Sequence, residues 1–323
     1  MPVILFLGIL IVLDSFKLVK KRIVALCLLW GMICVLIAYY LNHWLIYGDI
    51  LGEIDLIFNF IPPVTEELLK IIIIFILLAQ NRIGFMVDAA IYGFAVGAGF
   101  SLLENSYYFN QIDDGSTMLW LVRGFGTAIM HGGTVSIFSI LLVSALNRNR
   151  NISFYIIVGF LVAVSIHYLF NWLSSSPRLA TLSVIITIPT FLSIIFGINE
   201  KSIRKWIDLE MDQEVEMLLM IRKGKFSKTK AGRYIISLKE HFQPLIVLDM
   251  LSYIYIYLEL STKAKANLIL KENDMPPNKI PDIEEQFHEL RILRKSIGKT
   301  GMIALRPILR MNNKDLWTLT MLK

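Results

Sequence analysis

Apolar residues are arranged differently in two parts of the chain. Up to about residue 198 they form spans of roughly 17 to 25 residues separated by short polar breaks, which is the length a helix needs to cross about 30 Å of hydrocarbon. From Asn199 onward, apolar and charged residues are mixed in patterns typical of amphipathic helices. We predict seven membrane spans, over residues 2–18, 23–47, 60–79, 84–109, 118–146, 152–173 and 179–198.

The fold class that follows is all-α. We expect a polytopic membrane helix bundle of about seven transmembrane helices over residues 1–198, and a mainly helical, soluble cytoplasmic domain over residues 199–323. The composition agrees, because 55% of the residues are hydrophobic and 18% are charged, which argues against an ordinary soluble enzyme. The first span is interrupted at Asp14 and could be an uncleaved signal sequence, but no small-residue cleavage pattern follows it. We therefore expect it to be a membrane anchor.

Basic residues lie in alternate loops between the spans. One set of loops holds only Arg178, beside several acidic residues. The other set holds ten Lys and Arg residues: Lys17, Lys20, Lys21, Arg22, Arg82, Arg148, Arg150, Lys201, Arg204 and Lys205. By the positive-inside bias, the N-terminus is expected outside and the C-terminus in the cytoplasm.

The C-terminal segment carries the net charge of the protein. Residues 199–323 hold 22 Lys and Arg against 16 Asp and Glu, which accounts for the formal charge of +6. Its basic residues between Arg222 and Lys230 could lie on anionic lipid. The segment could also bind a cytoplasmic partner or self-associate. We predict no nucleic-acid binding, because no basic motif interleaved with aromatic residues occurs.

Four predicted spans carry ionisable or amide side chains that a membrane helix normally lacks. A charge in hydrocarbon is costly unless it faces the bundle interior or a wet cavity. At 1.5 Å per residue, the four spans bring these groups to a similar depth, nearer the outer face. This coincidence predicts one shared site, built from Thr65-Glu66-Glu67-Leu68-Leu69-Lys70, Leu103-Glu104-Asn105, Met130-His131-Gly132-Gly133 and His167-Tyr168-Leu169-Phe170-Asn171.

Each of these motifs also has a purely structural interpretation. Glu66 and Glu67 follow two prolines and could simply begin a helix, with Thr65 as its cap and Lys70 paired one turn later. A single intramembrane histidine could merely hydrogen bond to a neighbouring helix. Two histidines on neighbouring spans with facing carboxylates instead favour a water-activating proteolytic site or a divalent metal site.

The residue types suggest a division of roles. A carboxylate of Glu66 or Glu67 can take a proton from water, with Lys70 balancing the charge. Asn171 lies four residues after His167 on the same helical face and could donate to an oxyanion.

The fourth and fifth spans supply supporting residues. Glu104 and Asn105 could orient an imidazole or join a metal site. Arg123 is expected to snorkel or to pair with an acidic group. We expect Gly93, Gly97 and Gly99 to form a small-residue face for close helix packing.

With these motifs in view, the chain resembles the PrsW-type intramembrane proteases, a branch of the clan that contains CAAX-prenyl endopeptidases and bacteriocin-processing membrane proteins. The resemblance covers about residues 57–172. It rests on Glu66-Glu67-x-x-Lys70, Tyr92-Gly93-Phe94-x-x-Gly97-x-Gly99-Phe100-x-x-x-Glu104-Asn105, Arg123 through His131-Gly132, and His167-x-x-x-Asn171.

The resemblance implies an intramembrane endopeptidase of a prokaryotic cell membrane, acting near the outer face of the bilayer. It implies that Glu66 or Glu67 is the general base, that His131 and His167 orient water or polarise the carbonyl, and that Asn171 helps to hold the oxyanion. Glu104 matches a polar position of the family. The substrate would be a membrane-anchored protein or peptide; known family substrates include an anti-sigma factor, whose identity should not be transferred to this chain.

The need for a metal is open at this point. Because His-Glu-x-x-His and Cys-x-x-Cys patterns do not occur, we expect no cofactor; if a divalent metal such as zinc is used, Glu67, His131 and His167 would hold it. Two other functions also stay open. The buried Glu and His residues could serve a transporter or ion-binding protein, or the protein could be a non-catalytic sensor acting through its tail.

Overall fold

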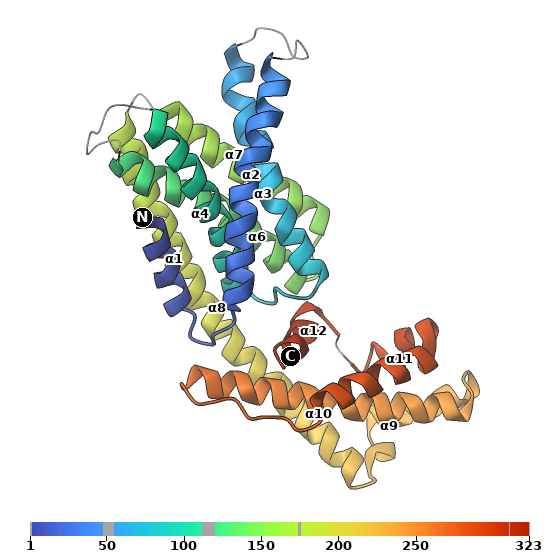
Figure 1. The fold of residues 1–323 in the computed structure, drawn as a ribbon. Helices are drawn as coiled ribbons and strands as arrows, with labels where there is room; N and C mark the ends of the chain where they lie inside the picture. The colour runs from blue at the N-terminus through green and yellow to red at the C-terminus, as the bar shows by residue number, and fades with distance from the viewer. Residues whose placement is uncertain (1, 48–54, 112–119, 174–175, 310, 323) are drawn as a thin grey trace. The chain divides into compact units, whose positions relative to one another are not determined.

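The structure, a computed structural model, describes residues 2–47, 55–111, 120–173, 176–309 and 311–322 (Figure 1). Every regular element in these ranges is a helix. The chain divides into two compact units, Met1–Glu200 and Lys201–Lys323. The all-helical prediction is confirmed; the cellular roles assigned to the two parts stay predictions.

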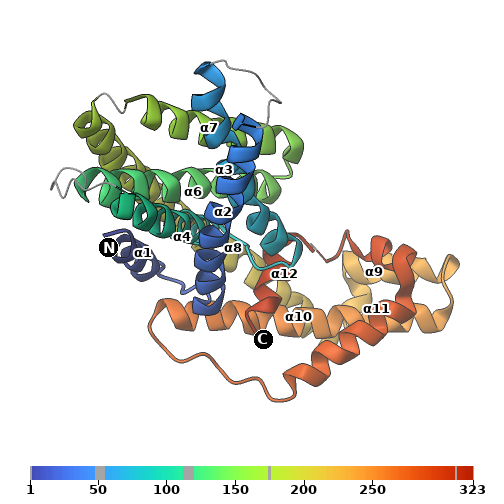
Figure 2. The same ribbon diagram turned by 45° about the horizontal axis from the view of Figure 1, so that its top comes forward.

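The first unit is a bundle centred on α4 and α6, as two views show (Figures 1 and 2). α4 packs against α2 and α6, α7 packs against α6, and α3 contacts α2 and α7. Its elements are α1 (Pro2–Val12), α2 (Lys21–Tyr47), α3 (Asp55–Ala79), α4 (Met86–Gln111), the π-helix η1 (Val122–Thr127), α6 (Ala128–Asn147), α7 (Ile152–Trp172) and the first part of α8 (Pro177–Arg222). The remainder of α8, from Lys201, belongs to the second unit.

Most of the predicted spans are long apolar helices. Six helices of the described residues are long and apolar enough to cross a membrane: α2, α4, η1 with α6, α7, α8 and α10. The first five match predicted spans. α3 is also long, with 25 residues, but Glu66, Glu67 and Lys70 interrupt its apolar sequence.

The segment 2–18 is not one span-length helix, contrary to expectation. α1 has 11 residues, which rise only about 16 Å. After α1, the carboxylate of Asp14 accepts the backbone N–H groups of Leu18 and Val19. These bonds hold the chain in a turn instead of a continuing helix.

Glycines let the central helices touch through their backbones, as the small-residue face predicts. A Cβ atom at Gly97 would lie 2.0 Å from the carbonyl oxygen of His131. A Cβ at Gly93 would lie 2.8 Å from that of Val135. Both distances are shorter than a van der Waals contact, so any larger residue would push α4 and α6 apart. The small-residue face of α4 thus fixes the position of the helix that carries His131.

α3 does not begin at its prolines. Pro62 and Pro63 lie inside the helix, which starts at Asp55. Proline has a helical φ and loses only its N–H donor. The alternative interpretation, in which Thr65 caps the start of the helix, therefore does not describe α3. The hydroxyl of Thr65 lies within hydrogen-bond distance of three acceptors, the backbone carbonyls of Ile61 and Pro62 and the side-chain oxygen of Asn42, and it can donate to one of them at a time.

The second unit packs shorter helices around α10. Its apolar core includes Met250, Ile254 and Leu260 of α10. α10 would also be apolar enough to cross a membrane, so a wholly soluble tail does not follow from composition. The described elements after α8 are η3 (Phe226–Lys228), α9 (Lys230–Ser237), η4 (Leu238–Glu240), α10 (Pro244–Glu272), α11 (Ile283–Leu305) and α12 (Asn313–Thr320).

Candidate active site

The structure brings together polar residues from four helices of the first unit. α3 contributes Glu66, Glu67 and Lys70, while α4, α6 and α7 contribute Glu104, His131 and His167, respectively. The side chains of Glu67, Lys70, His131 and His167 are at most 3% exposed. The sequence-based expectation that these segments meet is thus met by the geometry; their chemical roles stay predictions.

Glu67 contacts side chains of α3, α6 and α7. Its Oε1 lies 2.8 Å from Lys70 Nζ and 2.8 Å from His167 Nδ1. Its Oε2 accepts a 3.0 Å hydrogen bond from the hydroxyl of Thr134. Both oxygens are therefore engaged, and Glu67 fixes the ring of His167 through Nδ1, leaving Nε2 to face the site.

Lys70 determines the tautomer of His131. Its Nζ lies 2.8 Å from His131 Nδ1 and 3.9 Å from the centroid of the Phe100 ring. A charged lysine only donates, so Nδ1 accepts and the proton of neutral His131 resides on Nε2. That Nε2 lies 3.1 Å from Oε2 of Glu104, which accepts a hydrogen bond from the Nε2–H group.

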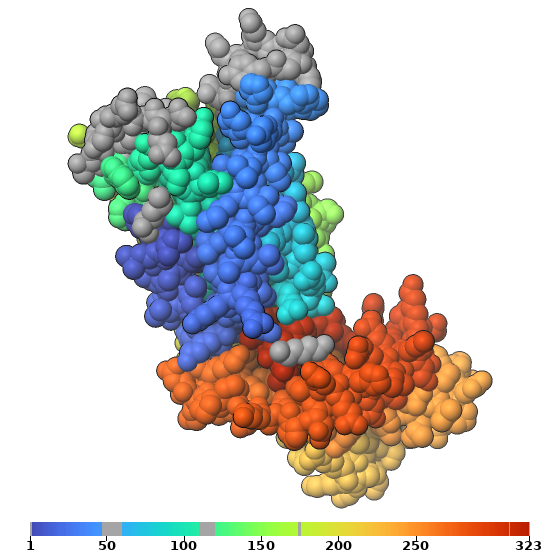
Figure 3. All heavy atoms as spheres, viewed as in Figure 1, coloured from blue at the N-terminus to red at the C-terminus, as the bar shows by residue number. Residues whose placement is uncertain are grey.

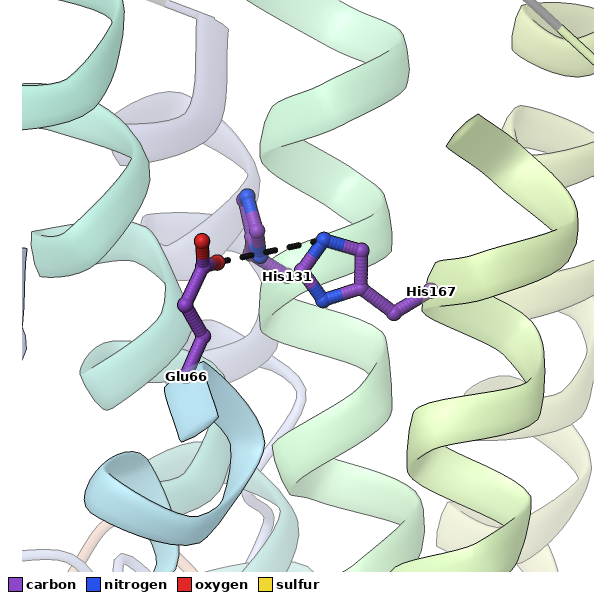
Figure 4. A group of neighbouring side chains, drawn as sticks. All are labelled: Glu66, His131 and His167. Atoms are coloured by element: carbon purple, nitrogen blue, oxygen red, sulfur yellow. Dashed lines mark ion pairs between the residues drawn. The ribbon is translucent and has the colours of Figure 1, made fainter. Parts of the chain in front are cut away.

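Glu66 differs from Glu67 in having an unused oxygen. Its Oε2 is buried and has no hydrogen-bond partner among the described residues. It lies 3.8 Å from His167 Nε2 and 3.8 Å from Lys70 Nζ. Figure 4 shows the Glu66 carboxylate and the two imidazoles converging from α3, α6 and α7.

The convergence makes Glu66, His131 and His167 a possible metal site. One ligand atom of each residue lies within 4.8 Å of the others. The sequence-based set of metal ligands was Glu67, His131 and His167, and it stays a prediction. In the structure, the carboxylate that converges with the two imidazoles is that of Glu66, while Glu67 is engaged by Lys70, His167 and Thr134.

Glu104 connects the site to η1. Its Oε1 lies 3.8 Å from Arg123 Nη1, and the Arg123 guanidinium carbon lies 3.4 Å from the ring centroid of Tyr108. The expected pairing of Arg123 with an acidic group is confirmed. Asn105 does not join the cluster, because its amide donates to Ser101 and to the backbone carbonyl of Arg123. Its role there is to tie α4 to η1.

Two residues depart from the sequence-based expectation. Asn171 is exposed and makes no hydrogen bond to the cluster among the described residues, although it lies one turn from His167. Thr134 was not anticipated, yet it donates to Glu67. Its position three residues after His131, on the same helical face, is a signal that the sequence offered.

A cavity of about 730 Å³ opens onto the cluster. Glu66 and Glu104 lie in its wall. The rest of the wall comes from Pro62, from α2 between Val35 and Ile46, and from α4 between Phe100 and Tyr108. The cluster is therefore accessible to a molecule much larger than water.

A sequence model of the PrsW family intramembrane metalloproteases matches residues 20–196 of this chain, more than half of its length. The chain belongs to the PrsW family. It is accordingly an integral membrane protein and an intramembrane protease. The match also includes α2 and the first part of α8, which lie outside the motifs recognised from sequence. No curated protein and no solved structure matches the chain significantly.

The cluster fits the divalent metal that the PrsW family description implies. Two imidazoles and one carboxylate form the donor set of many catalytic zinc sites. Glu66 Oε2 is a buried oxygen without a hydrogen-bond partner in the described structure. The residues could therefore hold a metal, and the expectation of a site without a cofactor stays a prediction.

Proposed function

We propose that this PrsW-family protein hydrolyses a peptide bond of a membrane-anchored protein or peptide near the outer face of the bilayer, with Glu66 as the general base. The observation that carries the proposal is the position of Glu66 Oε2. This oxygen is buried, has no hydrogen-bond partner in the described structure, and faces His167 Nε2 at 3.8 Å. A gap of that length is too long for a direct hydrogen bond and suits a reacting water between the two groups.

The two adjacent glutamates have different tasks in this proposal. Glu67 is fully engaged and positions His167. Glu66 takes a proton from water as the water oxygen attacks the carbonyl carbon of the peptide bond. It then returns that proton to the leaving amine as the C–N bond breaks, which gives one carboxylate and one amine product.

In an alternative form of this proposal, His131, Glu66 and His167 would hold a divalent metal, and Glu66 would then bind the metal instead of acting as the base. When bound there, the metal would polarise the water and the substrate carbonyl as a Lewis acid. The surrounding charges support a cation, because among the described residues Glu66, Glu67 and Glu104 pair with one lysine and one arginine, Lys70 and Arg123, besides the two histidines. Glu67 orients the ring of His167 through Nδ1 and leaves its Nε2 free to bind. His131 would bind through Nε2 only as the other tautomer, with its proton on Nδ1 facing an uncharged Lys70 and without its hydrogen bond to Glu104.

Asn171 is proposed as a donor to the oxyanion. It follows His167 by one helical turn, and its exposed side chain has no other partner in the described structure that would compete with a substrate. We expect Asn171→Ala to slow turnover about a hundredfold. An effect below threefold, measured with the assay below, would remove it from the mechanism.

The location of the reaction rests on loop charges. The positive-inside bias places the N-terminus outside and the C-terminal unit in the cytoplasm of a prokaryotic cell. In that orientation α3 enters the membrane from outside, and Glu66 lies in the outer half. The C-terminal unit would then bind a cytoplasmic partner or a second copy of the chain.

The test compares membranes from cells that express wild-type protein, Glu66→Gln or Glu240→Gln. New peptide N-termini in membrane proteins are identified by mass spectrometry. Glu240 is exposed and belongs to the second unit, so it is a matched control for the same chemical change. We expect products in wild-type and Glu240→Gln membranes and none in Glu66→Gln membranes.

Folding of each variant is verified by its elution as a single species in detergent. Identical products from wild type and folded Glu66→Gln would refute Glu66 as the base. If wild-type protein gave no products but drove ion or solute flux across liposomes, the site would serve transport instead.

A further inference from the structure

The walls of the 730 Å³ cavity carry information about the substrate. α2 and α4 form most of these walls, and Glu66 and Glu104 lie among them. In the space-filling view, α2 and the end of α4 lie side by side on one face of the first unit (Figure 3). A molecule in this cavity would therefore contact both the proposed base and the surface of these two helices.

Glycines and tyrosines shape the cavity. A Cβ at Gly31 would lie 2.0 Å from the carbonyl oxygen of Val96, and one at Gly99 would lie 2.0 Å from that of Leu28. The two backbones thus touch at this level. Further along, the rings of Tyr39 and Tyr107 stand between the helices, with centroids 6.2 Å apart. The helices are close at the glycines and are held apart by side chains beside the active site.

The cavity offers mainly apolar and aromatic contacts. Leu36, Tyr39 and Tyr107 lie in its wall and are 55%, 56% and 49% exposed, respectively. Asn42 also lies in the wall, with its side-chain oxygen next to the hydroxyl of Thr65. An asparagine amide can donate to a peptide carbonyl. This combination suits a peptide backbone with large apolar side chains.

The volume suits a peptide segment. At about 730 Å³, the cavity falls within the range of about 300–1,000 Å³ that is typical of pockets for small ligands.

We infer that this cavity is the substrate groove, and that it takes a short peptide segment with a large apolar or aromatic side chain next to the scissile bond. The inference rests on the proposed protease function. The segment is an unwound part or an end of the membrane-anchored substrate. Leu36, Leu103 and Tyr107 are the specificity-determining residues.

The test uses purified full-length protein in detergent with a library of tryptic peptides as the probe. Cleaved bonds are mapped by mass spectrometry for wild type, Leu103→Trp and Leu36→Trp, which fill the groove, and Tyr107→Ala, which widens it. Leu29→Trp is the matched control, because Leu29 is 57% exposed on the same helix α2 but outside the cavity wall. Glu66→Gln defines the background.

We expect wild-type cleavage next to Leu, Ile, Met, Phe, Tyr or Trp. The filling variants should cleave beside aromatic residues at least tenfold less often relative to small residues, and Tyr107→Ala should broaden the profile. Leu29→Trp should match wild type. Two filling variants keep the test valid if one fails to fold.

Three outcomes would overturn the inference. One is a wild-type profile without preference for large apolar residues. Another is an unchanged profile in both folded filling variants, particularly if native mass spectrometry shows a lipid that those variants lose, since the occupant would then be an acyl chain. In both cases Glu66-dependent cleavage would survive. The absence of any Glu66-dependent product would instead overturn the proposed function together with the groove.

Discussion

Two buried lysines, one in each unit, lie between two glutamates yet belong to very different surroundings. Lys70 lies 2.8 Å from Glu67 and 3.8 Å from Glu66. Lys265 lies 2.8 Å from Glu214 and 3.1 Å from Glu210. Both side chains are completely buried, and each lies over an aromatic ring.

The difference lies in what surrounds the charges. The Lys70 cluster includes two histidines and opens onto a cavity of about 730 Å³. The Lys265 cluster borders a cavity of only about 60 Å³, and no histidine of the described residues contacts it. A buried lysine between two carboxylates is thus, by itself, a structural ion-pair cluster. A catalytic site also needs imidazoles and a cavity for the substrate.

The strongest test of this comparison replaces one polar side chain in each cluster. We expect Glu66→Gln or His167→Ala to lower the rate of peptide cleavage about a thousandfold, because each change removes a group that handles the transferred proton or the water. Glu214→Gln, the matching change in the second unit, should leave the rate within twofold of wild type. Equal losses from Glu66→Gln and Glu214→Gln would mean that the first cluster is also structural.

Metal removal is the second test of the difference between the two clusters. Purified wild-type protein should contain about one divalent metal per chain and should lose cleavage after treatment with a chelator, with recovery on adding zinc. Metal content, measured by elemental mass spectrometry, should fall in His167→Ala and stay constant in Glu214→Gln. Full cleavage by metal-free protein would mean that a glutamate and a water molecule carry out the reaction without a metal.

The two lysines should be alike in stability and unlike in activity. Replacing either with methionine leaves buried carboxylates without their cation, which should cost about 3–5 kcal/mol. Chemical unfolding in detergent should therefore show comparable losses for Lys70→Met and Lys265→Met. Cleavage by the folded fraction should fall only for Lys70→Met. A stable Lys265→Met variant would argue that its cluster is not needed for packing.

A pH dependence of stability, without an effect on activity, is expected in the second unit. Burial, together with the negative charge of Glu210, raises the pKa of Asp315 from 3.8 to about 8. The folded state therefore keeps a proton between pH 4 and pH 8 that the unfolded state releases. Stability should decline as pH rises through this window, by up to about 1.4 kcal/mol per pH unit.

Thermal unfolding at several pH values measures this slope. Asp315→Asn should flatten it, since the amide does not titrate. Asp212→Asn is the control, because Asp212 is exposed. A slope that persists in Asp315→Asn would assign the proton to another group.

The sequence predicted the site better than it predicted the roles within it. Hydropathy located most helices, and buried polar residues indicated which helices meet. The sequence could not assign different roles to Glu66 and Glu67. Neighbouring residues point about 100° apart around a helix, and which of them faces the site depends on how the helix packs. Thr134 was missed for a similar reason, since a helix-interior threonine usually bonds to its own backbone.

Segment boundaries were harder still. The change in composition at Asn199 suggested that a helix ends there, but α8 continues to Arg222. Polar residues do not stop a helix unless a capping group or a breaker replaces its backbone bonds. The short α1 shows the converse, because Asp14 captures backbone N–H groups within a largely apolar segment.

Gly97 gives this enzyme an unusual point of vulnerability. Gly97 performs no chemistry itself. Because it has a hydrogen atom in place of a methyl group, α4 can approach the backbone of His131 closely, and this contact fixes the position of the His131 imidazole. A drug or a mutation need not reach the reacting atoms to inhibit the enzyme. Moving α4 away from α6 by the thickness of one carbon atom would lengthen every contact of that imidazole.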